Sequence, residues 1–401
     1  MKHNWGHFSD AELGVAVTEA AGVDVSKLRE LNSLSIVRAM RGQPPATVTE
    51  LAARTGLSRP GTDVVVRGLV TDGWVKVVEP DGSSVGRPAR RYHFNADAGY
   101  VLGVDVGGHK ILVLLADLEG KVLRSHRLAV EPDADPAARL KAVDTAITQC
   151  LTAAGMRPDQ IWAVTVGVTG PVDATGRTTL FTPLPGWASV SPAEHLATRF
   201  ACPILVENDC KLAAVAERWQ GAAQDADDIV YLLAGMRTGA GLILDGTLRR
   251  GYGGAAGEIG ALKAVRWLSA PSHIENCPGV PGDIHPNDKA AWVFERAREG
   301  DRDARTALRR YVKDLAVGAA ALVLTLDPQV VVLGGGYSRS ADLIIDPLAH
   351  ELRRLCLRVP EIRASNLGAD SVALGALRVA LDQIDARLFT DGMPAPLIPR
   401  P

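Results

Sequence analysis

The segment Val101–Lys110, VLGVDVGGHK, constrains the fold of this chain more than any other feature. An apolar run ends at Asp105, two glycines follow, and a second apolar run begins at Ile111. Apolar runs bounded in this way predict two strands joined by a turn. Because glycine has no Cβ, Gly107 and Gly108 would let the backbone approach a phosphate group closely. A plain hairpin turn also needs glycine, so the motif alone leaves both interpretations open.

Length and composition predict a soluble protein of two or three domains. The chain has 401 residues, of which 47% are hydrophobic and 22% charged, values typical of globular proteins. The five cysteines have neither zinc nor disulfide spacing, which predicts a reduced, cytoplasmic setting. No signal-peptide pattern and no apolar run of about eighteen residues is present. We therefore expect neither secretion nor membrane insertion.

Three short helices are expected near the N-terminus. The first begins at the candidate N-cap Ser26, the second spans about 48–54 after Thr47 or Thr49, and the third spans about 59–71 after a TGLS turn. An apolar stripe on the first helix comprises Leu28, Leu31, Leu34, Ile36 and Val37. The last two helices predict a helix-turn-helix, whose second helix enters the DNA major groove.

A hairpin after the third helix is expected to form a wing. Two strands flank a Pro-Asp-Gly turn at 80–82, and the segment 82–91 carries arginines but no acid. Gly-Arg-Pro holds Arg87 on a rigid, extended backbone that suits the minor groove. Residues 25–95 are thus interpreted as a winged helix-turn-helix DNA-binding domain, preceded by a tail at 1–24. The candidate DNA contacts are Ser58, Arg59, Thr62, Asp63, Arg67 and Arg87.

An alternative remains for this domain. Three helices and a hairpin also suit a protein-interaction domain, and an arginine cluster is often only a solvated face. Pro60 and Gly61 occupy the first turn of the third helix, where glycine presents no side chain and costs about 1 kcal/mol. We expect Arg59 and Arg87 to carry the DNA specificity.

From residue 96 onward, strand-like and helix-like runs alternate, which predicts α/β layers. The expected strands are 101–106, 111–115, 161–168, 204–206, 229–233, 241–244 and 330–333. The expected helices are 136–154, 212–217, 303–324, 341–354 and 375–385. Two phosphate-competent turns lie far apart in the sequence, so we expect two lobes that close on a cleft.

Carboxylates and glycines mark a candidate site in this body. Asn208 and Asp209 end an apolar run and begin a helix, where a carboxylate can accept a proton from a hydroxyl. An ordinary helix cap is the alternative for these two residues. Gly170 follows a strand, and Glu258 lies between glycines. The candidate phosphate-loop residues are Asp105, Gly107, Gly108, Gly239 and Gly335.

In this order, the motifs resemble those of the ROK family (repressors, open reading frames, kinases) over about residues 26–385. The resemblance implies an actin-like, hexokinase-like fold of two lobes for residues 96–401. It implies ATP-dependent hexose phosphorylation for the kinases of the family and sugar-responsive transcription for its longer members. By this resemblance Asn208 and Glu258 contact a sugar and Asp209 is the catalytic aspartate. The helix-turn-helix and the wing resemble the regulator branch.

The chain departs from the family pattern at five positions. His109 replaces a threonine of the first phosphate loop, and Pro183 replaces a sugar-binding asparagine. Met236 and Arg237 replace Thr-Gly in the second phosphate loop, and Ala261 replaces a histidine that binds sugar and zinc. Larger side chains in a phosphate loop would obstruct close backbone approach. We therefore expect no Mg-ATP turnover.

The cysteine-rich zinc segment of the family is also missing. Only Cys277, with His273 and His285 nearby, lies in that region. Structural zinc needs about four ligands, so we expect no zinc and no other metal.

These observations favour a DNA-binding transcriptional regulator of the repressor type. Its kinase-like body would sense a sugar-like ligand without phosphorylating it. Its expected partner is double-stranded DNA with a palindromic operator, bound by a homodimer or homotetramer. The alternatives are an ATP-dependent sugar kinase with an appended helix-turn-helix, in which Asp209 is catalytic, and a regulator that responds to a protein partner instead of a ligand.

Overall fold

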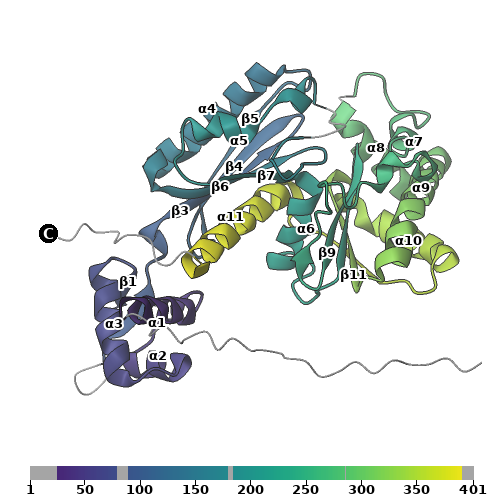
Figure 1. Ribbon diagram of the computed structural model, residues 1–401. Helices are drawn as coiled ribbons and strands as arrows, with labels where there is room; N and C mark the ends of the chain where they lie inside the picture. Colours follow the sequence, from purple (N-terminus) through teal and green to yellow (C-terminus); the bar gives the residue numbers. More distant parts are fainter. Residues whose placement is uncertain (1–24, 79–88, 179–183, 285, 391–401) are drawn as a thin grey trace, which may run out of the picture. The chain divides into compact units, whose positions relative to one another are not determined.

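A computed structural model describes residues 25–78, 89–178, 184–284 and 286–390 (Figure 1). The chain forms two compact units that divide between Phe94 and Asn95, one residue before the expected boundary. Each unit is described by itself. In the described residues, no helix combines the length and the apolar character needed to cross a membrane.

The first unit is a winged helix-turn-helix, as predicted. It contains α1 (Val25–Met40), α2 (Val48–Thr55), α3 (Arg59–Thr71), β1 (Val75–Val78) and β2 (Arg91–Phe94), and the two strands pair antiparallel. Thr47 caps α2 in a reciprocal capping box with Glu50, so Thr47 and not Thr49 is the cap. The expectation for Ser26 is wrong, because α1 already includes Val25.

The apolar stripe of α1 is only partly buried. Leu34, Ile36 and Val37 lie in the core, whereas Leu28 is 51% and Leu31 is 49% exposed. The first two leucines of the predicted stripe are therefore outside the core of this unit. The helix is amphipathic only over its second half.

The second unit contains two five-stranded sheets. The first has the order β5-β4-β3-β6-β7, with a β3–β4–β5 meander and parallel β3–β6–β7 pairing. Its strands are β3 (Tyr100–Val106), β4 (Lys110–Asp117), β5 (Val122–Ala129), β6 (Ile161–Val168) and β7 (Ile204–Asn208). The sequence did not predict β5, because this edge strand has no fully buried position and carries four charged or polar residues, VLRSHRLA.

The second sheet repeats this topology. Its order is β10-β9-β8-β11-β12, again with an antiparallel meander on one side and parallel strands on the other. Its strands are β8 (Ile229–Ala234), β9 (Thr238–Leu244), β10 (Thr247–Leu248), β11 (Val330–Gly334) and β12 (Glu361–Ala364). The two lobes therefore share one strand order, as expected of the predicted actin-like fold.

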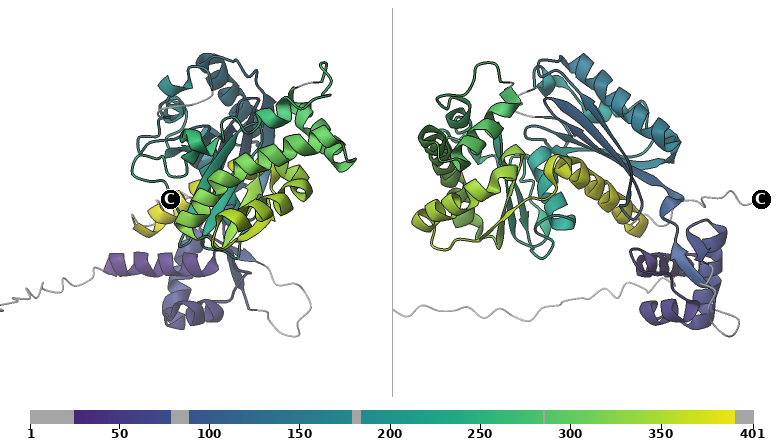
Figure 2. Two further views of the ribbon diagram at one scale, coloured as in Figure 1. Left: turned by 90° about the vertical axis from the view of Figure 1, so that its right-hand side faces the viewer. Right: turned by 180° about the vertical axis from the view of Figure 1, so that it is seen from behind.

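Helices cover both faces of each sheet (Figures 1 and 2). Three of these helices come from the first half of this unit's sequence: α4 (Pro136–Ala154), α5 (Pro192–Ala197) and α6 (Asp209–Trp219). The second half contributes α7 (Ser272–Glu275), α8 (Pro286–Arg298), α9 (Arg302–Leu326), α10 (Ala341–Leu355) and α11 (Ser371–Thr390). In the centre, α11 packs on the first sheet, α6 packs on the second, and the two helices pack on each other.

Glycines allow close packing between the first sheet, α11, α6 and the second sheet, which are stacked in this order. A Cβ on Gly103 of β3 would lie 2.3 Å from the Ala373 carbonyl oxygen of α11. A Cβ on Gly375 of α11 would lie 1.8 Å from the Leu212 oxygen of α6, and one on Gly241 of β9 would lie 2.2 Å from a backbone oxygen of α6. The two lobes thus meet through direct backbone contacts.

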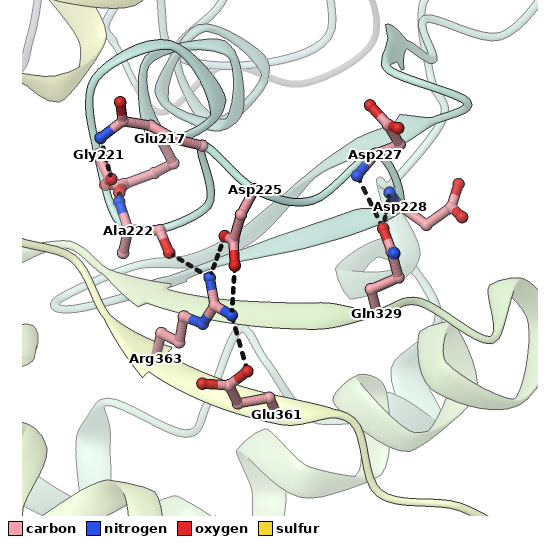
Figure 3. Close-up of polar contacts among 10 residues, drawn as sticks. Glu217, Gly221, Ala222, Asp225, Asp227, Asp228, Gln329, Glu361 and Arg363 are labelled. Atoms are coloured by element: carbon pink, nitrogen blue, oxygen red, sulfur yellow. Dashed lines mark hydrogen bonds and ion pairs between the residues drawn. The ribbon is translucent and has the colours of Figure 1, made fainter.

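Polar contacts tie the C-terminal end of α6 to the second sheet (Figure 3). The buried Glu217 carboxylate accepts hydrogen bonds from the Ala222 amide and the Ser365 hydroxyl. Arg363 of β12 pairs with Asp225 at 2.5 Å, and also with Glu361. These contacts join α6 and the loop after it to β12 and to Ser365, and α6 also packs on β8 and β9. The helix therefore belongs to the second lobe, although it follows the last strand of the first.

Candidate ligand site and DNA-binding surface

The first glycine turn joins β3 to β4, as predicted. Gly107 donates its amide hydrogen to the Lys110 carbonyl at 2.9 Å and closes the turn. Asp105, at the end of β3, is 6% exposed, and its carboxylate lies 3.2 Å from the Lys110 ammonium. Burial raises the pKa of Asp105 to about 6, although Lys110 opposes this shift and the charge of Asp209 adds to it.

A buried arginine supports this turn from behind. Arg139 of α4 is fully buried and donates to the Gly107 and Gly108 carbonyls at 2.7 and 3.3 Å. Its other terminal nitrogen donates to the carbonyls of Glu131 and Pro132. Burial, together with the charge of Arg237, lowers the pKa of the Arg139 guanidinium. The position of the loop is therefore fixed by side-chain hydrogen bonds to its carbonyls.

Asn208 forms the junction between β7 and α6. Its Oδ1 accepts a hydrogen bond from the Lys211 amide as the N-cap of α6, and its Nδ2 donates to the Gly170 carbonyl at 3.0 Å. Gly170 has a φ of 108°, which favours glycine. The helix-cap interpretation of Asn208 therefore holds in the structure, and the same contacts place Asn208 beside Gly170. Lys211 is buried and donates to the Gly254 carbonyl.

Asp209 and Glu258 form an acidic pair beside this junction. Asp209 is half-buried at the first position of α6, and its Oδ1 accepts a hydrogen bond from the Cys210 amide at 2.8 Å. Burial raises the pKa of Asp209, whereas its hydrogen bonds and the charge of Arg237 act against the shift. Burial also raises the pKa of Glu258, to which the negative charge of Asp209 adds and which Lys211 counteracts. Carboxyl groups placed in this way can accept hydrogen bonds from ligand hydroxyls.

Arg237 occupies the second phosphate loop and reaches the first. Its Nη2 lies 3.8 Å from the position that a Cβ on Gly108 would occupy. Its charge acts on both Asp209 and Arg139, and burial lowers its own pKa. A guanidinium therefore lies between the two loops that the sequence assigned to nucleotide phosphates.

Two of the predicted phosphate-loop glycines have packing roles. Gly239 lies in β9 and not in a loop, and a Cβ there would lie 2.8 Å from the Cys210 sulfur. Gly335 has a φ of 83° at the junction after β11, and a Cβ there would lie 2.5 Å from the Ala234 oxygen. Both positions need glycine for close packing within the second lobe.

The described residues at the place of the family's zinc segment have other partners. His273 pairs with Asp314 at 2.9 Å, and the Cys277 thiol is buried near the Pro278 carbonyl. His285 and the altered sugar position Pro183 lie outside the described residues. Among the residues described, no three or more His, Cys, Asp or Glu side chains gather where a metal ion could bind. One thiol and one carboxylate-paired imidazole do not fit a zinc ion.

On the first unit, the predicted DNA contacts differ in accessibility. Ser58 caps α3 by accepting a hydrogen bond from the Gly61 amide, and Arg59 is exposed at the start of α3. The side chain of Arg67 is 75% exposed and pairs with Asp63 one turn earlier. Thr62 is completely buried and donates its hydroxyl to the Ser58 carbonyl, so the expectation that it contacts DNA is wrong. Arg87 lies outside the described residues.

Comparison with known families follows the same division into two units. The ROK family profile matches residues 101–278 and 285–383, and the MarR family profile matches residues 30–83. The chain belongs to the ROK family. The MarR match covers the helix-turn-helix and the first strand of the wing, so this ROK protein carries a second, N-terminal module.

Relatives of two kinds are similar to this ROK protein. The xylose repressor of Caldicellulosiruptor bescii is 22% identical over 387 residues, covering 89% of this chain and 97% of the repressor. The xylose repressor of Bacillus subtilis is 23% identical, covering 90% of this chain and 97% of that protein. The glucokinase of Streptomyces coelicolor is 27% identical but covers 70% of this chain and 98% of the kinase.

Solved structures show the same fold. A ROK family glucokinase from Streptomyces griseus, in complex with glucose and AMPPNP, is 27% identical with a TM-score of 0.58 and covers 71% of this chain and all of that one. A ROK family transcriptional regulator, a homolog of the E. coli MLC protein, is 18% identical with a TM-score of 0.68. It covers 90% of this chain and 98% of that one, so its fold extends over both units.

Sequence reasoning missed several residues that build the site. Glu207 is buried, pairs with Arg250 at 2.5 Å and accepts a hydrogen bond from the Asn208 amide. A signal for Glu207 and Lys211 was present, because both are charged residues within a largely apolar strand and helix. Arg139 gave no signal, since an arginine in an amphipathic helix is ordinarily exposed.

Proposed function

We propose that this ROK protein is a transcriptional repressor that binds an operator through its N-terminal unit. Its body binds a sugar or sugar derivative, which it does not phosphorylate, and ligand binding changes the affinity for the operator. The observation that carries this proposal is Arg237, which lies against the first phosphate loop within a ROK body that follows a winged helix-turn-helix. The similarity to proteins named xylose repressor, over 89–90% of the chain, makes xylose the first ligand to test.

The site retains groups for hydroxyl recognition but not for phosphoryl transfer. Asp209 and Glu258 are half-buried carboxyls near Asn208, and such groups accept hydrogen bonds from sugar hydroxyls. Phosphoryl transfer would additionally need a loop open to ATP and room for its metal ion. The Arg237 side chain adds bulk beside the first phosphate loop, which would hinder close approach of the backbone to ATP, and its positive charge would repel the metal ion. This arrangement supports binding without turnover.

A short connection joins the DNA-binding unit to the ligand site. β2 ends at Phe94 and β3 begins at Tyr100, so five residues, 95–99, link the wing to the central strand that carries Asp105. Ligand contacts that favour one arrangement of the two lobes would shift the orientation of β3. The coupling free energy equals the difference between the free energies with which the ligand binds the DNA-bound protein and the DNA-free protein. We also propose a cytoplasmic location, where a regulator of this kind would reach its DNA target.

The second candidate function is a sugar kinase. The position of Asp209, at the first residue of α6 with a raised pKa, favours it because such a carboxylate can accept a hydroxyl proton. Arg237 in the second loop opposes it. A coupled assay with Mg-ATP and common hexoses distinguishes the two functions. Turnover that disappears in Asp209→Asn would replace the repressor proposal with the kinase.

The first experiment is selection of DNA fragments by the purified full-length protein. Fragmented genomic DNA and a randomised duplex library are incubated at several salt concentrations, and bound duplexes are sequenced. We expect one enriched palindrome, bound by a homodimer or homotetramer, with an affinity that falls steeply as salt rises. No enrichment at low salt would rule out an operator-binding repressor.

A second experiment then tests sugar binding with the operator recovered in the first. Xylose, glucose, N-acetylglucosamine and their phosphates are titrated into the complex and into the free protein in thermal-shift assays. We expect one sugar to raise the melting temperature and to change operator affinity, and Asp209→Asn to lose both effects while it keeps operator binding. Asp159→Asn is the matched control, because Asp159 is an exposed aspartate paired with Arg157. Flat melting curves for every sugar would count against ligand sensing.

A further inference from the structure

The exposed face of α3 has an unusual composition for a recognition helix. Its outward positions include Pro60, Gly61, Val64, Arg67 and Thr71. Val64 is 61% exposed, although valine is ordinarily buried. It lies four residues after Pro60 and three before Arg67, so the three side chains share one face of the helix. An apolar group thus occupies the centre of the surface expected to face DNA.

The polar side chains on and beside this face are engaged within the unit. Arg67 is paired with Asp63, and the Thr71 hydroxyl donates to the Arg67 carbonyl at 3.0 Å. Arg59 donates its Nε hydrogen to the Thr49 hydroxyl at 3.3 Å. These contacts hold the polar groups in place and reduce their freedom to read base edges. Val64 can make only apolar contacts.

Small neighbours leave Val64 accessible to a base edge. Gly61, one turn earlier, presents no side chain and is exposed. Gly68, one turn later, also lacks a side chain, although the Arg29 guanidinium of α1 lies 3.1 Å from the position that a Cβ there would occupy. A valine side chain is short, so it reaches a base only when the helix backbone lies deep in the groove. The exposed Gly61 permits that depth on the N-terminal side of Val64.

Base pairs display one apolar group in the major groove, the C5 methyl of thymine. We propose that Val64 packs against a thymine methyl in each operator half-site and thereby selects a T·A pair at that position. This inference rests on the proposed DNA-binding function and names the chemistry by which that function recognises sequence. Arg67 and Arg59 then position α3 on the phosphates.

Deoxyuridine substitution tests this proposal directly, because deoxyuridine differs from thymidine only by the missing methyl. Each thymine of the selected operator is replaced in turn, and affinity is measured by fluorescence anisotropy with the full-length protein. We expect one position per half-site at which the substitution weakens binding by about fourfold, the factor that burial of one methyl supplies. Val64→Ala should weaken binding to the thymine operator by a similar factor.

The decisive result is the double-mutant cycle. Val64→Ala should bind the thymine and deoxyuridine operators equally, because the contact is already lost. Leu31→Ala, at an exposed leucine of α1, is the matched control and should keep the full preference for thymine. The inference is wrong if Val64→Ala, compared with the wild type, loses the same factor in affinity for the deoxyuridine operator as for the thymine operator. It is also wrong if no single thymine substitution weakens binding while the unmodified operator is bound tightly. Absence of DNA binding would overturn this inference and the proposed function together.

Discussion

The contact between α6 and α11 provides the sharpest test of the packing described above. Gly375→Ala is expected to destabilise the second unit and to weaken ligand binding. The new Cβ would lie 1.8 Å from the Leu212 carbonyl oxygen, whereas real Cβ atoms essentially never approach another heavy atom within 3.0 Å. The two helices must therefore separate by at least 1.2 Å, the difference between these distances. Leu212 lies one turn after Asp209, so the displacement reaches the candidate ligand site.

The magnitude follows from two opposing effects. Overpacking costs about 1–3 kcal/mol, and the upper end applies because α11 cannot retreat. On its other side, α11 already contacts β3, where a Cβ on Gly103 would lie 2.3 Å from the Ala373 oxygen. Alanine in a helix regains about 1 kcal/mol relative to glycine. The net loss is about 2 kcal/mol, which lowers the melting temperature by about 3 °C for a unit of this size.

Circular dichroism melting of the full-length protein measures this effect. Gly253→Ala is the control, because nothing lies within 4 Å of a Cβ at that position and its φ is not positive. We expect the control to melt like the wild-type protein and Gly375→Ala to melt earlier, with weaker stabilisation by the ligand. A melting temperature of Gly375→Ala at or above that of the wild type would refute the close α6–α11 contact, since helix propensity alone would raise it.

Three further predictions concern the cap, the buried acid and the second phosphate loop. Thr47→Ala should cost about 1 kcal/mol by removing the capping box of α2, and hydrogen exchange should then be faster in peptides of residues 48–55. Burial raises the pKa of Asp105 from 3.8 to about 6, so the folded state binds this proton more tightly than the unfolded state does. The protonated carboxyl therefore contributes about 3 kcal/mol of stability below about pH 4, and this contribution is lost as the pH rises through 6. Asp105→Asn should therefore gain stability relative to the wild type at pH 7 but not at pH 4 in parallel melts, and an equal difference at both values would contradict the raised pKa. The double variant Met236→Thr, Arg237→Gly should gain thermal stabilisation by Mg-ATP, and no gain would show that Arg237 is not what obstructs the nucleotide.

Local patterns predicted most elements of the fold, because the buried strands and the long helices have clear periodicity. β6 and α4 begin and end at the predicted residues. β5 and α8 were missed for a common reason: both have many charged residues and few buried positions, so their hydrophobic pattern is weak. The shared strand order of the two lobes depends on long-range hydrogen bonding, which no local pattern contains.

The candidate site was predictable where its residues lie at the ends of apolar strands. Asp105, Asn208 and Asp209 were identified for that reason. Arg139 was not, because its role depends on burial against a loop that lies 31 residues earlier in the chain. Thr62 shows the opposite error, since it lies on the recognition helix in sequence but faces the core of the unit. In both cases the orientation of one side chain decides the role, and helix position alone did not determine it.

The contacts of α6 also give the proposed regulation by a kinase-like body a physical basis. The candidate ligand residues Asn208 and Asp209 lie at the start of α6, and the end of the same helix is fixed to β12 through Glu217 and Ser365. α6 contacts α11, and α11 contacts β3, whose other end continues into the wing through residues 95–99. A ligand bound at the start of α6 can therefore affect β3 through the close packing of α6 on α11 and of α11 on β3. In the proposed regulator, binding energy that a kinase uses to stabilise the transition state would instead bias the lobes between two arrangements.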